Sequence, residues 1–187
     1  MTIEQLEIIK EQSECLFSEA DVEDALMRMA LEIERDLSRK LPVVITVMNG
    51  GLITTARLAS KLRFPLQMDF LHVSRYRNDT FGSELKWYAT PSVQLKNRCV
   101  LIVDDILDEG VTLREVIDYC KGQGASEVLS AVLLKKNSSR VVPNISANFV
   151  GMEVDDRYVF GSGLDFKGYL RNLPGIYAVP EEVLLNN

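Results

Sequence analysis

The chain has 187 residues, enough for one well-buried domain with a small additional lobe. Hydrophobic residues make up 47% and charged residues 26% of it, a composition typical of globular domains. The 21 Lys and Arg residues are outnumbered by 27 Asp and Glu, and the net charge of −6 comes without any basic cluster. This balance disfavours nucleic acid as a partner.

No apolar stretch approaches the ~18 residues that are needed to span a bilayer. The first residues, Met1–Gln5, also lack the basic region that begins a secretion signal. We therefore expect a cytoplasmic protein without a membrane partner. The three cysteines, Cys15, Cys99 and Cys120, have no metal-ligand spacing and are expected to be reduced, two of them in the core.

Helices and strands alternate along the chain. Ser18 and Asp21 are typical of a helix start, and the apolar period that follows predicts a helix ending near Lys40. Strands are predicted over residues 43–47, 67–73, 84–88, 99–103, 128–134 and 148–154. Helical spacing predicts two more helices, one with Leu52, Ala56, Ala59 and Leu62 on its apolar side and one with Leu113, Val116, Ile117 and Cys120.

This alternation predicts an α/β fold, with a mainly parallel sheet flanked by helices. Residues 1–20 and 155–187 lie outside the clean alternation, and we expect them to pack together as a small hood lobe. The core would then cover about residues 21–154, within a single domain that spans residues 1–187.

The most informative segment runs from Cys99 to Thr112. Its buried strand ends in Asp104 and Asp105, and Asp108, Gly110 and a helix start follow. In an open α/β sheet the ligand crevice lies beyond the carboxyl ends of the strands, and the N–H groups at a helix start bind phosphate. The two aspartates suit the hydroxyls of a sugar, so the segment predicts a sugar-phosphate site. In a simpler interpretation, the aspartates only end the strand.

Taken as one string, the segment resembles the 5-phosphoribosyl-1-diphosphate (PRPP) signature of type I phosphoribosyltransferases: a hydrophobic strand, two acids, and then Asp-x-Gly-x-Thr. Roughly residues 40 to 180 follow hypoxanthine-guanine phosphoribosyltransferases in order, with matches at Met48-Asn49-Gly50-Gly51, Lys135, Tyr158-Val159, Leu164-Asp165 and Arg171. The resemblance implies purine salvage: Mg²⁺-dependent transfer of the phosphoribosyl group from PRPP to N9 of a 6-oxopurine. Hypoxanthine or guanine would give IMP or GMP and diphosphate. It also implies a homodimer or homotetramer.

The resemblance assigns a role to individual residues. Asp108 would be the general acid or base that handles the proton at N7 of the purine. The ribose and the 5′-phosphate would be held by Asp104, Asp105, Asp108, Glu109, Gly110, Val111 and Thr112. The diphosphate would be held by Asn49, Gly50, Gly51 and Arg171, in a loop that often contains a non-proline cis peptide bond.

The base would be held by three residues: Lys135 would donate to the 6-oxo oxygen, Tyr158 would stack on the ring, and Val159 would offer backbone groups. Asp165 would hold the Mg²⁺, with Asp104 and Asp105 acting through water or ribose. Arg75 and Tyr76 belong to a polar segment that would form a lid over the diphosphate.

Three residues depart from the family pattern: Asn49 and Arg75 stand where Lys and Ser are common, and Glu109 where Thr is common. Arg75 would offset the charge that is missing at Asn49. Because a carboxylate in a phosphate pocket opposes binding, we expect the Glu109 side chain to point to solvent or toward a cation.

Each residue also has a simpler interpretation by itself. Thr112 with Glu115 would form a helix-capping box, and Gly50-Gly51 an ordinary turn. Lys135 and Lys136 would be solvated charges, Asp165 a turn residue, Arg171 a surface arginine, and His72 a packed strand residue. Two other functions also stay open: transfer to another base, such as xanthine or hypoxanthine only, and a PRPP-sensing regulatory protein of the same fold.

Overall fold

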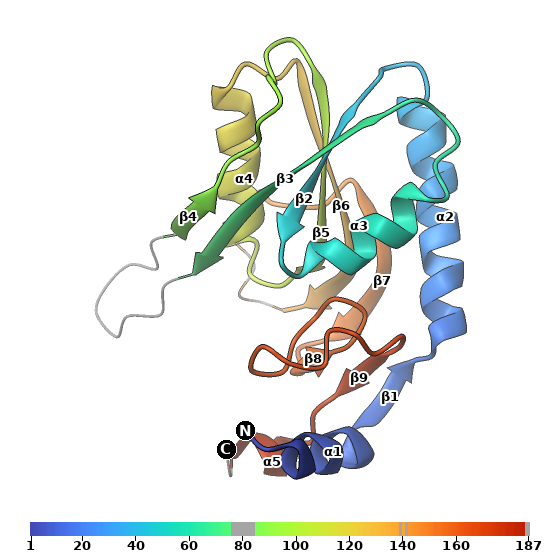
Figure 1. Cartoon of the computed structure of the whole chain (residues 1–187), viewed down its shortest axis with the longest axis vertical. Coiled ribbons are helices and arrows are strands. Elements are labelled where there is room, and N and C mark those ends of the chain that lie inside the picture. Colours follow the sequence, from blue (N-terminus) through green and yellow to red (C-terminus); the bar gives the residue numbers. More distant parts are fainter. Residues whose placement is uncertain (76–84, 139, 141, 186–187) are drawn as a thin grey trace.

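The computed structural model describes residues 1–75, 85–138, 140 and 142–185, which form two β-sheets and five helices (Figure 1). The helices are α1 (Ile3–Gln12), α2 (Glu19–Leu37), α3 (Gly51–Ala59), α4 (Val111–Gly122) and α5 (Glu181–Leu185). The strands are β1 (Glu14–Phe17), β2 (Val43–Met48), β3 (Gln67–Arg75), β4 (Leu85–Ala89), β5 (Cys99–Leu107), β6 (Glu127–Asn137), β7 (Phe149–Asp155), β8 (Val159–Phe160) and β9 (Ile176–Ala178).

The main sheet has the strand order β4-β3-β2-β5-β6-β7, and only β4 runs antiparallel to its neighbour. Helices α2 and α3 cover one face and α4 covers the other (Figure 1). Alternate residues of β5 point to the two faces of the sheet. Leu101 and Val103 pack in the core beneath α2, and Val100 and Ile102 pack in the core beneath α4. The predicted fold, a mainly parallel sheet flanked by helices, is confirmed.

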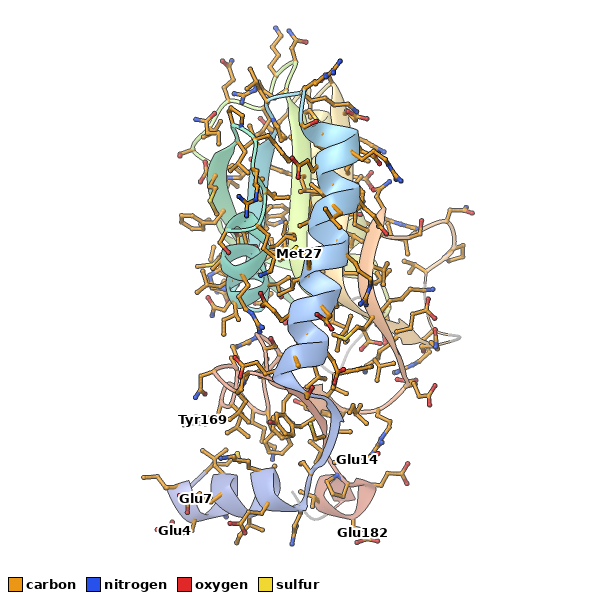
Figure 2. The ribbon with its side chains drawn as sticks, turned by 90° about the vertical axis from the view of Figure 1, so that its right-hand side faces the viewer. Glu4, Glu7, Glu14, Met27, Tyr169 and Glu182 are labelled. Carbon is orange, nitrogen blue, oxygen red and sulfur yellow. The ribbon has the colours of Figure 1, made fainter. Side chains whose placement is uncertain are left out.

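Helix α2 begins where the sequence predicts. Ser18 is its N-cap: the Ser18 N–H donates to Asp21 Oδ2 at 2.8 Å, and the Asp21 N–H donates to Ser18 Oγ at 3.3 Å. This reciprocal cap satisfies donors that a helix start otherwise leaves unpaired. Figure 2 shows the helix lying along the main sheet, with Met27 on its outer side.

The predicted apolar side of α3 is only partly right: Leu62 is buried, but it lies beyond the end of the helix. Leu52 and Ala56 are exposed, and the buried residues of the helix are instead Gly51, Thr54, Thr55 and Leu58. The reason is a close approach to the sheet: a Cβ on Gly51 would lie 2.6 Å from the Val103 carbonyl oxygen. Small residues allow this contact, and a search for large apolar side chains overlooks them.

Strands β5 and β6 are longer than their apolar runs predict. β5 continues to Leu107 and β6 to Asn137, because the parallel ladder between them extends through Ile106↔Leu134 and Leu107↔Lys135. Asp104 and Asp105 therefore lie on a paired strand rather than in a loop after it.

The two ends of the chain meet in the small sheet, whose strand order is β1-β9-β8. β9 pairs antiparallel with β1 on one side and with β8 on the other. Ile9 of α1 packs with Phe160, Phe166 and Val179 in a separate apolar cluster. Figures 1 and 2 show this lobe, with α1 and α5, at one end of the main sheet, and Glu4, Glu7 and Glu182 lie at its outer end.

Cys99 and Cys120 are buried and Cys15 is exposed, and all three are free thiols. Burial raises the pKa of both Cys99 and Cys120 to about 11, so these thiols stay protonated at neutral pH. Within the described residues, no helix is both long enough and apolar enough to cross a membrane.

Asp69 fixes the segment that leads from β4 toward β5. Its carboxylate accepts hydrogen bonds from the backbone N–H groups of Phe70, Ser92 and Val93 and from the Ser92 hydroxyl, at 2.7–3.0 Å. Burial by itself would raise the pKa of Asp69, but these bonds together hold that pKa below its usual value.

We predict that Asp69→Asn lowers the free energy of unfolding by about 1–2 kcal/mol at pH 7, because a carboxylate accepts more strongly than an amide. Since the folded-state pKa is depressed, this contribution is full above about pH 5 and is lost as the pH falls through that pKa. Urea unfolding at a series of pH values from 7 down to about 2.5 measures both effects, with Asp24→Asn on the exposed side of α2 as the control. Equal losses at pH 7 and at the acid end of the series would contradict the role of the charge.

Candidate active site

A pocket of about 430 Å³ opens at the carboxyl ends of the central strands, between the main sheet and the small lobe. Strand β5 and the turn after it contribute Asp105, Ile106 and Asp108, and β6 and the segment after it contribute Lys136 and Arg140. The remaining lining residues are Asp156, Arg157, Tyr158, Val159, Leu164 and Asp165. Charged side chains of both signs therefore surround this pocket, with one aromatic residue among them.

The two acids at the end of β5 are both withdrawn from water. Asp104 is 8% exposed, and its Oδ1 accepts the Asp105 N–H at 2.9 Å. Burial raises the pKa of Asp104 well above its usual value, and repulsion by Asp105 adds to this effect. Burial also raises the pKa of Asp105, although the nearby Arg171 guanidinium opposes this. Of the two, only Asp105 is among the described residues that line the pocket.

Glycines let the loop after β2 lie directly against these acids. The loop contains a cis peptide bond between Met48 and Asn49, of the kind that the resemblance implies. A side chain on Gly50 would collide with the Asp105 carboxylate, and one on Gly163 would collide with the Gly50 carbonyl oxygen. Gly163 also has φ +110°, a conformation that favours glycine. The loop of the small lobe thus packs on the loop after β2.

The turn from Asp108 to Thr112 leads into α4. Gly110, at φ +81°, is the N-cap of the helix and makes no side-chain cap. The capping box between Thr112 and Glu115 is therefore not formed, and that interpretation is wrong. The first N–H groups of α4 have no partners within the helix, so they remain available to an anion.

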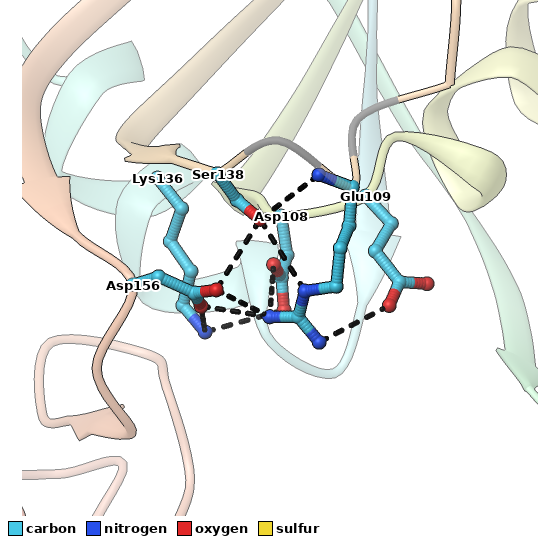
Figure 3. A network of polar contacts seen from close by, with 6 residues as sticks. Asp108, Glu109, Lys136, Ser138 and Asp156 are labelled. Carbon is cyan, nitrogen blue, oxygen red and sulfur yellow. Dashed lines mark hydrogen bonds and ion pairs between the residues drawn. The ribbon is translucent and has the colours of Figure 1, made fainter.

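Five charged side chains and Ser138 form a network at one side of the pocket (Figure 3). Lys136 Nζ lies 3.3 Å from Asp108 Oδ2 and 3.6 Å from Asp156 Oδ1. Arg140 Nη2 lies 2.7 Å from Asp156 Oδ1, and Nη1 lies 3.6 Å from Glu109 Oε1. The expectation that Glu109 points toward a cation is thus confirmed, and the cation is Arg140.

The structure corrects the prediction for Lys135. Its Nζ pairs with Glu153 Oε1 at 2.9 Å, and the side chain is 39% exposed, whereas Lys136 is 12% exposed and lines the pocket. Successive residues of a strand point to opposite faces, so only one of the two lysines can face the pocket. The preceding residues 131–134 are all buried, so they carry no alternation that tells the two lysines apart.

Sequence reasoning also missed Arg140 and Asp156. Arg140 follows the end of β6 and Asp156 follows β7, and the two meet only because β6 and β7 pair side by side in parallel. A charged residue after a strand is a common feature. No signal in the sequence therefore distinguished them.

The small lobe supplies the remaining side of the pocket. Tyr158 is 40% exposed, and its ring packs edge-on against Phe166 at 5.5 Å between centroids. Val159 is buried on β8, where it pairs with Ala178. Both residues line the pocket next to Asp165, so three of the predicted residues from this lobe come together.

Arg171 joins the lobe to the end of β5. Its Nη2 lies 2.6 Å from Asp165 Oδ1, its Nη1 lies 3.8 Å from Asp105 Oδ2, and Nη1 donates to the Gly163 carbonyl oxygen at 2.6 Å. Arg171 and Asn49 both line a second pocket of about 400 Å³. Arg171 is therefore a structural cation beside the loop after β2, not a free surface arginine.

The donor set limits how a Mg²⁺ ion could be held. Among the described residues, no group of three or more His, Cys, Asp or Glu side chains forms a metal cage. Mg²⁺ is commonly held by one or two carboxylates, with waters and substrate phosphates as its other ligands. Asp105 and Asp165, which flank Arg171, fit a magnesium ion of that kind, whereas Asp104 lies outside the pocket lining.

Of the two predicted lid residues, Arg75 is the last residue of β3, and Tyr76 lies outside the described residues. His72 stacks on Tyr88 with 4.8 Å between ring centroids. The interpretation of His72 as a packed strand residue is thus confirmed.

Comparisons with known proteins agree with this arrangement. Residues 14–167 match the model of the phosphoribosyl transferase domain. The chain is 35% identical over 162 residues to the hypoxanthine-guanine phosphoribosyltransferase of Bacillus subtilis, covering 86% of this chain and 89% of the relative. The corresponding enzyme of Streptococcus pneumoniae is 33% identical over 174 residues, covering 91% and 95%.

A solved structure gives the same result. The hypoxanthine phosphoribosyltransferase of Staphylococcus aureus superposes with a TM-score of 0.87 at 27% identity, covering 94% of this chain and 96% of that one. Fold, site position and sequence therefore lead to one conclusion: the chain belongs to the phosphoribosyltransferase family.

Proposed function

We propose that the protein transfers the 5-phosphoribosyl group of PRPP to N9 of hypoxanthine or guanine, releasing diphosphate and forming IMP or GMP. The observation that carries this proposal is the pairing of Asp108 with Lys136, 3.3 Å apart in the pocket. On the edge of a free 6-oxopurine, O6 is an acceptor, and N7 carries a proton and donates in the tautomer whose N9 can attack the ribose. One carboxyl group and one ammonium group, side by side, match that edge.

The two residues would divide the work on the base. Lys136 donates to O6, a contact that adenine cannot make because its amino group has no acceptor to offer. Asp108 holds or removes the proton at N7 while the bond from N9 to the ribose forms. Lys136 thus takes the role that the resemblance implied for Lys135.

The other faces of the pocket fit the rest of the reactants. Tyr158 is exposed enough to stack on the base, which contributes roughly 1–3 kcal/mol in comparable sites. The N–H groups of residues 110–112 bind the 5′-phosphate at the start of α4. Asp105 accepts from ribose hydroxyls, and the loop of Asn49, Gly50 and Gly51 holds the diphosphate together with Arg171.

Mg²⁺, held by Asp165 and Asp105, would neutralise charge on the diphosphate leaving group. Arg171 keeps the two carboxylates apart and oriented, since it pairs with both. It also supplies the positive charge that is missing at Asn49.

We also propose that the protein works as a homo-oligomer in the cytoplasm. Met68 and Phe70 of β3 are 50% and 46% exposed, and they share one face of the strand because they are two residues apart. Tyr88, stacked on His72, extends this apolar area at the edge of the sheet. Contact with a second copy would cover it, and size-exclusion chromatography measures whether a dimer or tetramer forms.

We predict that the purified protein with PRPP and Mg²⁺ converts hypoxanthine and guanine but not adenine, and that chelation of Mg²⁺ stops the reaction. Asp108→Asn lowers kcat about 10²–10⁴-fold, because a general acid or base contributes that much. Asp118→Asn on the exposed side of α4 is the matched control. Turnover of xanthine alone would indicate another base preference, and binding of PRPP without turnover would favour a sensor.

The neighbouring lysines provide a second test. We predict that Lys136→Gln lowers kcat/KM for hypoxanthine about 10- to 100-fold, the value of a lost hydrogen bond to a charged donor. Lys135→Gln changes it less than about twofold, because an exposed ion pair contributes little. Steady-state kinetics with both variants checks this, and a larger effect at Lys135 would refute the assignment.

A further inference from the structure

The guanidinium group of Arg140 is held by hydrogen bonds at Nε and Nη2, whereas Nη1 makes only a long ion pair. Nη2 donates to both carboxylate oxygens of Asp156, at 2.7 and 2.8 Å, and Nε donates to Ser138 Oγ at 3.3 Å. These bonds hold the plane of the guanidinium group. Nη1 lies 3.6 Å from Glu109 Oε1, an ion pair too long for a hydrogen bond. In Figure 3, dashed lines mark these contacts at the labelled Glu109 and Asp156 carboxylates.

Glu109 lies in the turn that leads to the start of α4. The backbone ties the two partners together, because the Val142 N–H donates to the Glu109 carbonyl oxygen at 2.8 Å. Glu109 directly precedes Gly110, the N-cap of α4, so its pairing with Arg140 brings the guanidinium group to the turn before the helix start. A phosphate bound there would be repelled by the Glu109 carboxylate and attracted by the Arg140 guanidinium.

The Arg140 side chain is 54% exposed and Glu109 is 31% exposed. Their ion pair is open to water, so separating it costs little. A phosphate dianion offers Nη1 a stronger acceptor than a single carboxylate, and it can accept hydrogen bonds from the planar guanidinium group.

We propose that Arg140 is a binding residue for the 5′-phosphate, and that Glu109 is the internal anion that occupies it when no phosphate is bound. On binding, the phosphate replaces Glu109 at Nη1, while Asp156 and Ser138 keep the guanidinium group in place. This inference rests on the proposed function, because it assigns the phosphate of the same substrate and product to these residues.

Because the phosphate must displace Glu109 from Arg140, every ligand that carries the phosphate binds more weakly. Part of the attraction of Arg140 is already used by Glu109, and the displaced carboxylate remains nearby as a like charge. A nucleotide product is thus held less tightly than in a site with a neutral residue at position 109. The Glu109 carboxylate favours product release at the expense of affinity.

The test compares ligands with and without the phosphate. We expect Arg140→Gln to weaken IMP binding about 10-fold or more, and Glu109→Gln to tighten it about three- to tenfold. Inosine, which lacks the phosphate, binds the Glu109→Gln variant equally within about twofold and loses less affinity than IMP in the Arg140 variants, which also touch the base-binding network. Isothermal titration calorimetry measures these affinities, and Arg140→Lys, which keeps the charge, recovers part of the loss.

A double variant separates direct contact from a general charge effect. Because Glu109 competes for Arg140, Arg140→Gln costs more in the Glu109→Gln background than in the original protein. The matched controls are Arg35→Gln and Asp36→Asn, which remove the same charges from an exposed ion pair on α2 at 3.0 Å. We expect these two control variants to bind IMP as tightly as the unsubstituted protein does.

The inference fails if the Arg140 variants lose as much affinity for inosine as for IMP, or if Glu109→Gln weakens IMP binding. The proposed function stands in either case, provided that the unsubstituted protein forms IMP from hypoxanthine and PRPP. If the original protein binds no IMP and forms none, both fail together.

Discussion

Parallel pairing between β5 and β6 continues past the apolar residues of both strands, and the site depends on this continuation. The ladder carries Leu107 opposite Lys135, so the residues that follow on each strand also lie side by side. Asp108 and Lys136 then meet at 3.3 Å. If the two strands separated where their apolar runs end, the carboxyl and ammonium groups would have no fixed distance. The backbone pairing of the ladder thus continues to Lys135, where the side chains of β6 have become polar.

The second constraint is the close packing of loops from distant parts of the chain. Gly50 and Gly163 place two backbones in direct contact above Asp105. Arg171 reinforces this contact by donating to the Gly163 carbonyl oxygen and by pairing with Asp105 and Asp165. The small lobe is thereby attached at the place where the proposed chemistry needs a cation and two carboxylates. A side chain on Gly50 would displace the Asp105 carboxylate, and one on Gly163 would push the lobe away from the loop after β2.

Charged side chains in and beside the pocket are arranged in pairs. Lys136, Arg140 and Arg171 each face at least two carboxylates, so no described cation of the three stands alone. Burial raises the pKa of Asp104 and Asp105, and it also makes an added negative charge near these two carboxyl groups costly. An anionic substrate therefore has to take over cations that already have partners. The affinity for an anionic substrate therefore depends on how easily these cations give up their carboxylate partners.

The sequence by itself determined the fold class, the start of α2 at Ser18 and the family, because these depend on local patterns. The string from Asp104 to Thr112 is also local, so its acids, its glycine and its helix start could be recognised without a structure. Only the tertiary structure decided between Lys135 and Lys136, since the buried run before them hides which side chain faces the pocket. It alone brought Arg140 to Asp156 and Glu109 and buried the small residues of α3. Such contacts depend on strand register and on the distance between elements, and a single sequence records neither.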